Sequence, residues 1–248
     1  MGGSYMLQIV KRMPLLRDAS TRRYLKGMPV IRQVRRAIRK TRNAYYRHLG
    51  GYQLRKALAA TTNRRVVIGA WDRYDSDWIP TQREFLNLVK AEDWERFFQP
   101  NSIDAILAEH VWEHLTLEDS RVAARACFKY LRPGGYLRVA VPDGLLPDPT
   151  YVDLVKADSP VPNDHKVLYS YRTLSEVFEK AGFRVKLYEY FDEEGVFHDL
   201  GWDQSRGTIS RSRRFDPRNR GGQLASVYPG SLDDYMAYSS IVLDAIKE

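Results

Sequence analysis

Two acid–histidine pairs lie close together near the middle of the chain, Glu109-His110 and Glu113-His114. Carboxylate and imidazole groups transfer protons near neutral pH, and both also bind metal ions. His110 and His114 share a face only if the segment between them is helical. The string lacks the His-Glu-x-x-His order of a zinc-protease helix. We therefore expect a strand-to-helix turn here and no metal, and capping of the next helix is a structural alternative for Glu113.

Two further residues with proton-transfer chemistry follow. Asp143 stands in a Pro-Asp-Gly sequence directly after an apolar run, and His165 stands in an Asp-His-Lys sequence. Histidine suits a general base at neutral pH, whereas an aspartate in such a sequence is also an ordinary turn residue. We expect the catalytic residues to be His165, Asp143 and His110. A structural role is the alternative for each of them.

The elements that position these side chains alternate between strands and helices. Short apolar runs predict buried strands over residues 65–69, 78–81, 85–88, 102–108, 136–141 and 183–191. Helical spacing predicts helices over 91–98, 118–131 and 171–181, and residues 239–246 fit a strand or a helix. Glycine and proline predict a sharp turn at 132–135 and long loops at 142–165 and 201–230. The alternation predicts an α/β fold, a mostly parallel Rossmann-like sheet with helices on both faces. The carboxyl ends of its strands form the edge at which ligands bind.

A strongly basic segment precedes this alternating pattern. Residues 1–71 hold seventeen of the 39 Lys and Arg residues but one of the 31 acids. We expect a helix over 29–49 that ends at Gly50-Gly51, and a second helix over 52–60. The sequence thus predicts a basic helical N-terminal arm, residues 1–62, and an α/β domain, residues 63–248.

Three interpretations of this arm remain open. Its helical stripe of apolar residues packs on the domain, with the bases solvated, or residues 11–56 lie on an anionic membrane surface. Alternatively, the bases bind nucleic acid, although no known nucleic-acid motif is present. The stripe consists of Ile31, Val34, Ile38, Tyr45 and Leu49.

The composition limits the cellular compartments and the kinds of catalytic chemistry that we expect for this protein. No run of eighteen apolar residues and no secretory signal is present, so we expect a cytoplasmic protein, with the inner face of the membrane as an alternative place for the arm. The single cysteine, Cys127, fits a reducing compartment and is expected to be a small buried residue on a helix. Neither a Walker loop nor a Gly-x-Ser-x-Gly nucleophile motif occurs.

The block from Asp104 to Asp143 resembles class I, Rossmann-like S-adenosylmethionine-dependent methyltransferases. Its Glu-His-Leu sequence at 113–115 follows a strand, and its Leu-Arg-Pro-Gly-Gly sequence at 131–135 precedes the next. Asp164-His165-Lys166 also resembles a bacterial branch that is associated with polysaccharide or natural-product assembly. The resemblance extends over residues 64–191.

The resemblance implies S-adenosylmethionine as cofactor and methyl transfer to an oxygen or nitrogen of a small molecule or glycan. The implied cofactor contacts are Gly69, Ala70, Gln82, Glu109, His110 and His114. Two positions depart from the family pattern. The glycine-rich turn is reduced to Gly69 with the bulky Trp71 nearby, and Gln82 stands where an acid is usual. These departures keep a second hypothesis open, a catalytically inactive binding module on the same fold.

Overall fold

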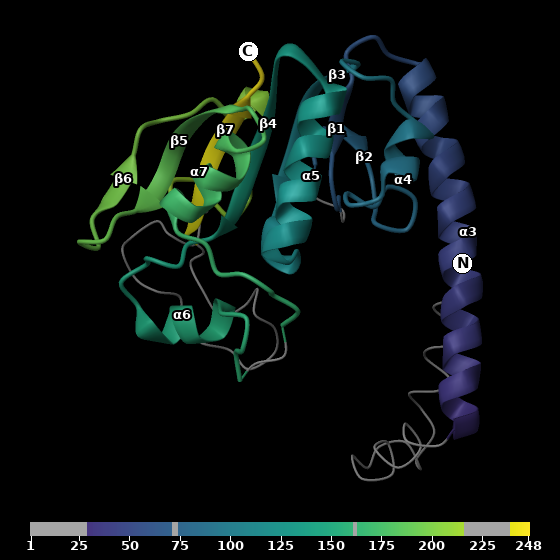
Figure 1. The fold of residues 1–248 in the computed structure, drawn as a ribbon, viewed down its shortest axis with the longest axis horizontal. Coiled ribbons are helices and arrows are strands. Elements are labelled where there is room, and N and C mark those ends of the chain that lie inside the picture. Colours follow the sequence, from purple (N-terminus) through teal and green to yellow (C-terminus); the bar gives the residue numbers. More distant parts are fainter. Residues whose placement is uncertain (1–28, 71–73, 161–162, 216–238) are drawn as a thin grey trace. The chain divides into compact units, whose positions relative to one another are not determined.

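The computed structural model describes residues 29–70, 74–160, 163–215 and 239–248. Residue contacts divide the chain between Leu49 and Gly50, within helix α3, and the second unit contains the sheet (Figure 1). The helices and strands, in chain order, are α3 (Pro29–Ala59), β1 (Arg65–Val67), β2 (Ile79–Pro80), α4 (Ala91–Glu95), β3 (Ile103–Glu109), η2 (Trp112–His114), α5 (Leu117–Tyr130), β4 (Leu131–Pro142), α6 (Pro149–Val155), α7 (Tyr171–Glu179), β5 (Arg184–Phe191), β6 (Phe197–Asp199), η3 (Gln204–Arg206) and β7 (Ser240–Ile246). The boundary predicted between residues 62 and 63 lies between α3 and β1.

The strands of the described residues form one sheet in the order β2-β1-β3-β4-β7-β5-β6 (Figure 1). β1 pairs in parallel with β2 and β3, and β3 pairs in parallel with β4. β7 is antiparallel to both β4 and β5, so β5 runs in the same direction as β1 to β4. The predicted mostly parallel sheet is confirmed, and the segment left open between strand and helix is strand β7. The carboxyl ends of β1 to β4 meet at one edge.

One face of the sheet is covered by α5 and α7, both predicted from helical spacing. Their buried side chains form one core with strand residues such as Val66, Ile106 and Val139. Small residues on α5 bring this helix close to the sheet, and one of them is Cys127, which is fully buried. Burial raises the pKa of its thiol. The interpretation of Cys127 as a small core residue is confirmed.

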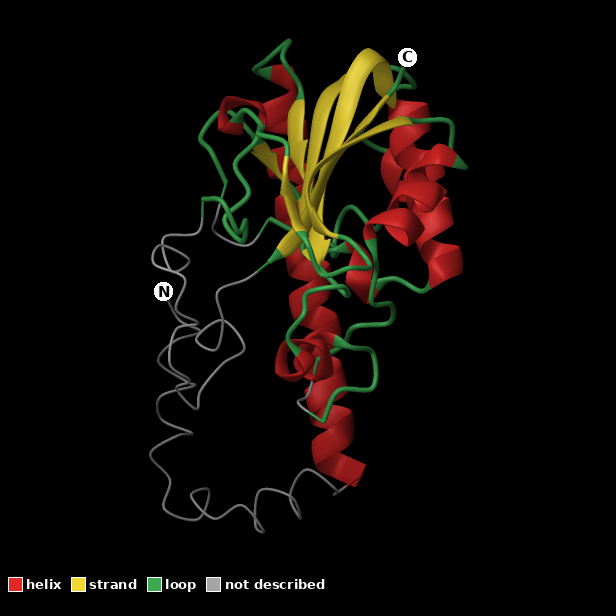
Figure 2. Ribbon diagram, turned by 90° about the vertical axis from the view of Figure 1, so that its left-hand side faces the viewer, coloured by secondary structure: helices red, strands yellow, loops and turns green. Residues whose placement is uncertain are grey.

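The opposite face is covered by an irregular segment, residues 200–215, in which η3 is the helical turn. Figure 2 shows the sheet nearly edge-on, with helices along one side and mainly loops along the other. The buried guanidinium of Arg138 on β4 pairs with Asp244 on β7, with 2.8 Å between Nε and Oδ1. It also donates hydrogen bonds to the carbonyls of Asp203 and Gly207. These bonds hold the segment on this face, and the described residues place no second helical layer there.

Helix α3 runs through Gly50-Gly51, so the predicted helix end at these glycines was wrong. The predicted second helix over 52–60 is the last part of α3. A Cβ atom at Gly50 would overlap the ring of Phe85, and one at Gly51 would lie 3.3 Å from Cζ of Phe97. Leu54 and Leu58, one and two turns further on, are buried in the core. The glycines therefore permit close packing of the helix and do not end it.

The middle of α3 exposes large side chains. Tyr45 is 61% exposed, Tyr46 50% and Leu49 38%, although Tyr45 and Leu49 belong to the predicted apolar stripe. The side chains of the other three stripe residues lie outside the described part of the chain. Across the described residues, no helix combines the length and apolar character needed to span a membrane.

The apolar run over 85–88 is not the predicted third strand. These residues form turns, in which Phe85, Leu86 and Leu88 are buried in the core. Their apolar character therefore reflects packing and not strand pairing. The short helix predicted over 91–98 is confirmed as α4, whose Trp94 stacks on Tyr130 of α5.

The predicted sharp turn at 132–135 is a bulge within β4. The pairing with β3 passes from Ile103↔Leu131 to Ala105↔Tyr136, so four residues of β4 bulge outward beside one residue of β3. Gly134 has φ +75, and its amide donates to the carbonyl of Lys247, which keeps the bulge attached to the end of β7.

The two predicted long loops differ in structure. The first, 142–165, contains helix α6, which was not predicted because this stretch is rich in proline and aspartate. Asp148 caps α6 by accepting hydrogen bonds from the amides of Thr150 and Tyr151, and Pro149 occupies its first position. The second, 201–230, is irregular apart from η3 up to residue 215, and the rest of it lies outside the described residues.

Candidate functional site

The carboxyl edge of the sheet carries most of the residues that the sequence analysis selected. Gly69, Gln82 and His110 follow β1, β2 and β3, Glu109 ends β3, and Asp143 follows β4. These four strands are neighbours and parallel, so the residues after them lie along one edge. Sequence order and strand direction were sufficient to predict this placement.

The turn after β1 is tight at Gly69. Gly69 has φ +64, a left-handed conformation that favours glycine, and a Cβ atom here would lie 3.2 Å from Cγ2 of Val111. The next amide, that of Ala70, donates to the carbonyl of Thr81 at 3.0 Å. The side chain of Ala70 is 3% exposed, so this residue offers a ligand little beyond its backbone. The predicted bulky neighbour Trp71 lies outside the described residues.

Gln82 follows β2 and is half-buried. Its backbone carbonyl accepts hydrogen bonds from the amides of Phe85 and Leu86 and fixes the turn there. Within the described residues, no hydrogen bond of its side-chain amide is recorded. The amide group can donate to and accept from hydroxyl groups. Gln82 therefore fits the role of a ligand contact at this edge.

Glu109 has protein partners for both carboxylate oxygens. Oε2 accepts the amide of Ser210 at 3.1 Å, and Oε1 accepts the amide of Arg211 at 2.7 Å. The side chain thereby attaches the irregular segment to the end of β3. A ligand hydroxyl at Glu109 would compete with these amides, so its geometry favours a structural role.

His110 connects β3 with η2 in a left-handed conformation, φ +54. Its amide donates to the carbonyl of Ala140 at 2.8 Å, which continues the pairing with β4. Nε2 lies 3.0 Å from Oγ of Ser240, and Nδ1 lies 3.2 Å from Oε1 of Glu113. Both ring nitrogens therefore face protein groups.

Asp143 is fully buried and joins three parts of the chain. Oδ1 accepts the amide of Leu145 at 3.0 Å, and Oδ2 accepts the amide of Phe191, at the end of β5, at 2.7 Å. Burial raises the pKa of this carboxyl to about 6, although the two amide hydrogen bonds oppose the shift. The geometry favours the structural alternative for Asp143.

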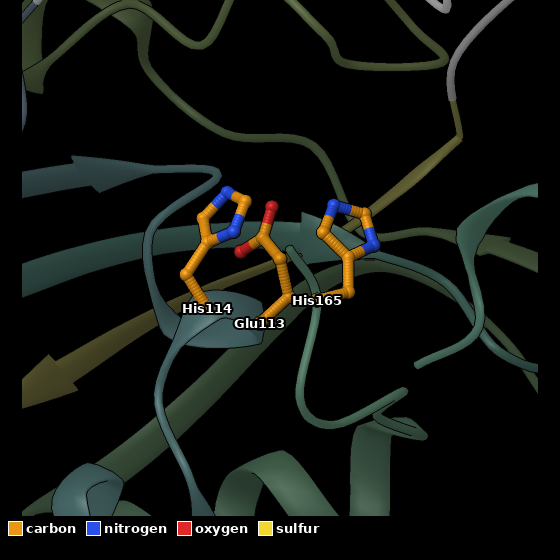
Figure 3. Close-up of side chains that lie close together, drawn as sticks. All are labelled: Glu113, His114 and His165. Carbon is orange, nitrogen blue, oxygen red and sulfur yellow. The ribbon is translucent and has the colours of Figure 1, made fainter. Parts of the chain in front are cut away.

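A separate cluster forms where η2 meets the segment after α6. Figure 3 shows the carboxylate of Glu113 between the imidazoles of His114 and His165. One ligand atom from each of the three lies within 4.8 Å of the others, and the two rings meet edge to face at 4.9 Å between centroids. The amide of Lys166 donates to the carbonyl of Glu113 at 2.6 Å and holds the segments together. All three residues stand out by type in the sequence, which does not indicate that His165 lies beside the other two.

Glu113 is the most deeply buried member of this cluster, at 2% exposure. Among the described residues, neither of its oxygens has a hydrogen bond of normal geometry. Burial opposes its ionisation most strongly, yet His110 and His114 together hold the pKa of Glu113 below its ordinary value. The site therefore contains a buried carboxylate that favours nearby positive charge.

Residues 34–187 match the family model described as a methyltransferase domain. The chain belongs to this methyltransferase family. A probable S-adenosylmethionine-dependent methyltransferase of Mycolicibacterium smegmatis is 33% identical over 100 residues, which cover 40% of this chain and 34% of that protein. The chain thus matches about a third of the length of this curated relative.

Solved structures of similar proteins include a possible histamine N-methyltransferase from Thermotoga maritima and a methyltransferase from Archaeoglobus fulgidus. The first is 15% identical with a TM-score of 0.43, and the alignment covers 86% of this chain and 97% of that one. The second is 14% identical with a TM-score of 0.43, and the alignment covers 81% and 94%.

Proposed function

We propose that this chain transfers a methyl group from S-adenosylmethionine to an oxygen or nitrogen of a small molecule or glycan. The family match includes β1, β3 and β4, the strands whose carboxyl ends form the candidate site. The observation that carries the proposal is the left-handed Gly69 directly after β1. A turn without a side chain lets a ligand approach the backbone closely.

The described residues at this edge fit the cofactor. Gly69 provides the close approach, and the amide of Gln82 is available for the ribose hydroxyls. Glu109, which the resemblance implied as a contact, is occupied by Ser210 and Arg211 and contributes by fixing the wall of the site. When bound, S-adenosylmethionine supplies the activated methyl group, and the protein orients the donor and the acceptor.

The acceptor loses a proton when it gains the methyl group, and we propose His165 as the residue that takes it. Nδ1 of His165 lies 2.7 Å from the carbonyl oxygen of Val155, which can only accept, so Nδ1 carries the hydrogen. The lone pair is then on Nε2, which is turned toward Glu113 and His114 (Figure 3). We assign Asp143 and His110, whose polar atoms face protein groups, to positioning.

Titration calorimetry with S-adenosylhomocysteine tests the cofactor site, with two glycine variants. We expect wild-type protein to bind, and Gly69→Ala to bind at least about tenfold more weakly, since the new Cβ meets Val111. Gly134→Ala is the matched control. Gly134 is also left-handed, at φ +75, but the space around it is open, and it lies near the amino end of β4, away from the candidate site at the carboxyl edge. Wild-type protein that releases no heat at millimolar ligand would contradict the proposal, and equal weakening in both variants would exclude Gly69 from the site.

A second candidate function concerns α3, the basic helix. Its sequence contains nine Lys and Arg residues and no acid, and Tyr45, Tyr46 and Leu49 on it are exposed. Exposed aromatic and aliphatic groups on a cationic helix are typical of helices that lie on anionic lipid surfaces. We propose such a surface as the partner of the arm, which would bring the enzyme to a lipid-linked acceptor.

A further inference from the structure

We propose that Glu113, His114 and His165 bind a divalent transition-metal ion, with Zn²⁺ as the best-matched species. Two imidazoles and one carboxylate form a ligand set that zinc adopts at sites with an open coordination position. This set differs from the pair His110 and His114, which the sequence spacing suggested and the turn excludes. His110 is not one of the proposed metal ligands.

The three groups lie somewhat farther apart than the ligands of a zinc ion do, so they would have to move slightly toward one another to bind one. Their ligand atoms lie within 4.8 Å of one another, whereas ligands about 2.1 Å from a tetrahedral Zn²⁺ are roughly 3.4 Å apart. The carboxylate of Glu113 and the ring of His165 both end on rotatable bonds. Side-chain rotation alone can therefore bring them to the ion.

The buried carboxylate supports a cation here. An ionised acid that lacks normal hydrogen bonds in a protein interior is costly, and native structures rarely tolerate one without a partner. Glu113 combines 2% exposure with two such oxygens in the described residues. Nδ1 of His110 lies 3.2 Å from Oε1, and a bound ion would add a directly coordinated positive charge at this carboxylate.

An outer contact orients the imidazole of His165 as metal ligands usually are. Histidines that bind metals commonly donate their other ring N–H to a backbone carbonyl or a carboxylate. His165 makes this contact with the carbonyl of Val155 at 2.7 Å. Asp164, whose Oδ1 lies 2.8 Å from Nδ1 of His114, adds negative charge beside the site.

The segment that carries His165 is fixed by its own hydrogen bonds. The side chain of Asn163 accepts the amide of His165 at 3.2 Å and donates to the carbonyls of Leu154 and Lys156. The amide of Lys166 is bound to the carbonyl of Glu113. The backbones of His165 and Glu113 are thus held next to each other, which lowers the cost of binding an ion.

This inference goes beyond methyl transfer and does not depend on it. A bound ion would take the Nε2 lone pair of His165 that otherwise receives the acceptor proton. It would instead offer open coordination positions, at which an acceptor oxygen loses its proton more readily. Metal binding is measured without cofactor, so failure of one proposal leaves the other intact.

The test uses chelator-treated full-length protein titrated with Zn²⁺ by calorimetry, and with Co²⁺ by visible absorption. We expect one equivalent to bind, with the Co²⁺ spectrum of a four- or five-coordinate site. His165→Gln and Glu113→Gln should each weaken binding by at least about tenfold. His165 is only partly buried, so its variant remains informative if Glu113→Gln does not fold.

His198→Gln is the matched control, because His198 on β6 pairs with Asp192, just after β5, at 2.6 Å and outside the cluster. It should bind Zn²⁺ as the wild type does. Wild-type protein that binds no equivalent, or His165→Gln with unchanged affinity, would overturn the proposal. Equal losses in His165→Gln and His198→Gln would also overturn it, since they would indicate scattered surface binding.

Discussion

Asp143 holds the ends of β4 and β5 together through the amides of Leu145 and Phe191. Its burial has a consequence for stability, because the pKa of about 6 in the folded chain exceeds the ordinary value near 3.8. Between these values the folded protein binds a proton that the unfolded chain releases. The stabilisation is complete below the unfolded pKa and is lost as the pH rises through about 6.

We therefore expect the wild type to lose about 1 to 1.5 kcal/mol of unfolding free energy between pH 5 and pH 7.5, relative to Asp143→Asn. Asparagine does not titrate, so the difference between the two proteins isolates this carboxyl from the histidines. Urea denaturation at the two pH values measures it. A difference that stays constant would show that Asp143 has an ordinary pKa in the folded protein.

Residue types and spacing were sufficient to select the chemistry-bearing side chains but not to assign their partners. Glu109 and Asp143 were predicted at the ends of strands, and they lie there. Their carboxylates bind amides 101 and 48 residues away, however, and no local pattern indicates such contacts. The Asp-His-Lys sequence marked His165, yet its proximity to Glu113 depends on the packing of two loops.

At the scale of elements, the glycine pair of α3 predicted the end of a helix from the sequence, but in the structure it lies inside a continuous helix. Gly50 faces the ring of Phe85, which is 6% exposed. Glycine costs a helix interior about 1 kcal/mol relative to alanine, so an alanine would be favoured here if space allowed. The packing against Phe85 removes that space.

Gly50→Ala should therefore lower the free energy of unfolding by about 1 to 3 kcal/mol relative to Gly51→Ala. Both changes gain the same helix propensity, but at Gly51 the nearest atom is 3.3 Å away on the half-buried Phe97. Thermal and urea unfolding of the two variants measure the difference. Equal stabilities would show that the helix does not pack at Gly50 as described.

Long periodic elements were predicted well, and the short apolar runs at 65–69 and 78–81 were identified as strands, whereas the run at 85–88 and the helix end at Gly50-Gly51 were wrong. α5 and α7 have full helical patterns, and β3 and β5 have enough apolar residues to identify a strand. The apolar residues at 85–88 fill the core without pairing. The local sequence of the β4 bulge predicts a turn. The bulge depends on a contact with the end of β7, more than a hundred residues away, which the local sequence does not indicate.

At the scale of the whole chain, positive charge is concentrated in the first 71 residues, whereas residues 72–248 contain 30 acids and 22 bases. An uneven distribution of this kind directs the basic segment toward anionic partners. The exposure of Tyr45, Tyr46 and Leu49 favours a lipid surface over a purely ionic partner.

We expect the full chain to co-sediment with vesicles that contain phosphatidylserine but not with phosphatidylcholine vesicles, and less at high salt. The double variant Tyr45→Ser, Leu49→Ser should bind several-fold more weakly. Tyr74→Ser, at a 40% exposed tyrosine outside α3, serves as the control. Single-stranded RNA is tested in parallel. Binding to RNA with no binding to anionic vesicles would favour the nucleic-acid interpretation of the arm.

The sequence by itself determined the fold class, the basic arm, the family resemblance and the edge of the sheet at which the chemistry-bearing residues lie. All four follow from composition, periodicity and short motifs, which the chain carries locally. Tertiary structure decided the rest. It enclosed Asp143 and Glu109 in amide contacts, kept α3 continuous through two glycines, and placed His165 beside Glu113 and His114. Each of these outcomes depends on contacts between residues distant in the chain, which form only when the loops close and the core excludes water.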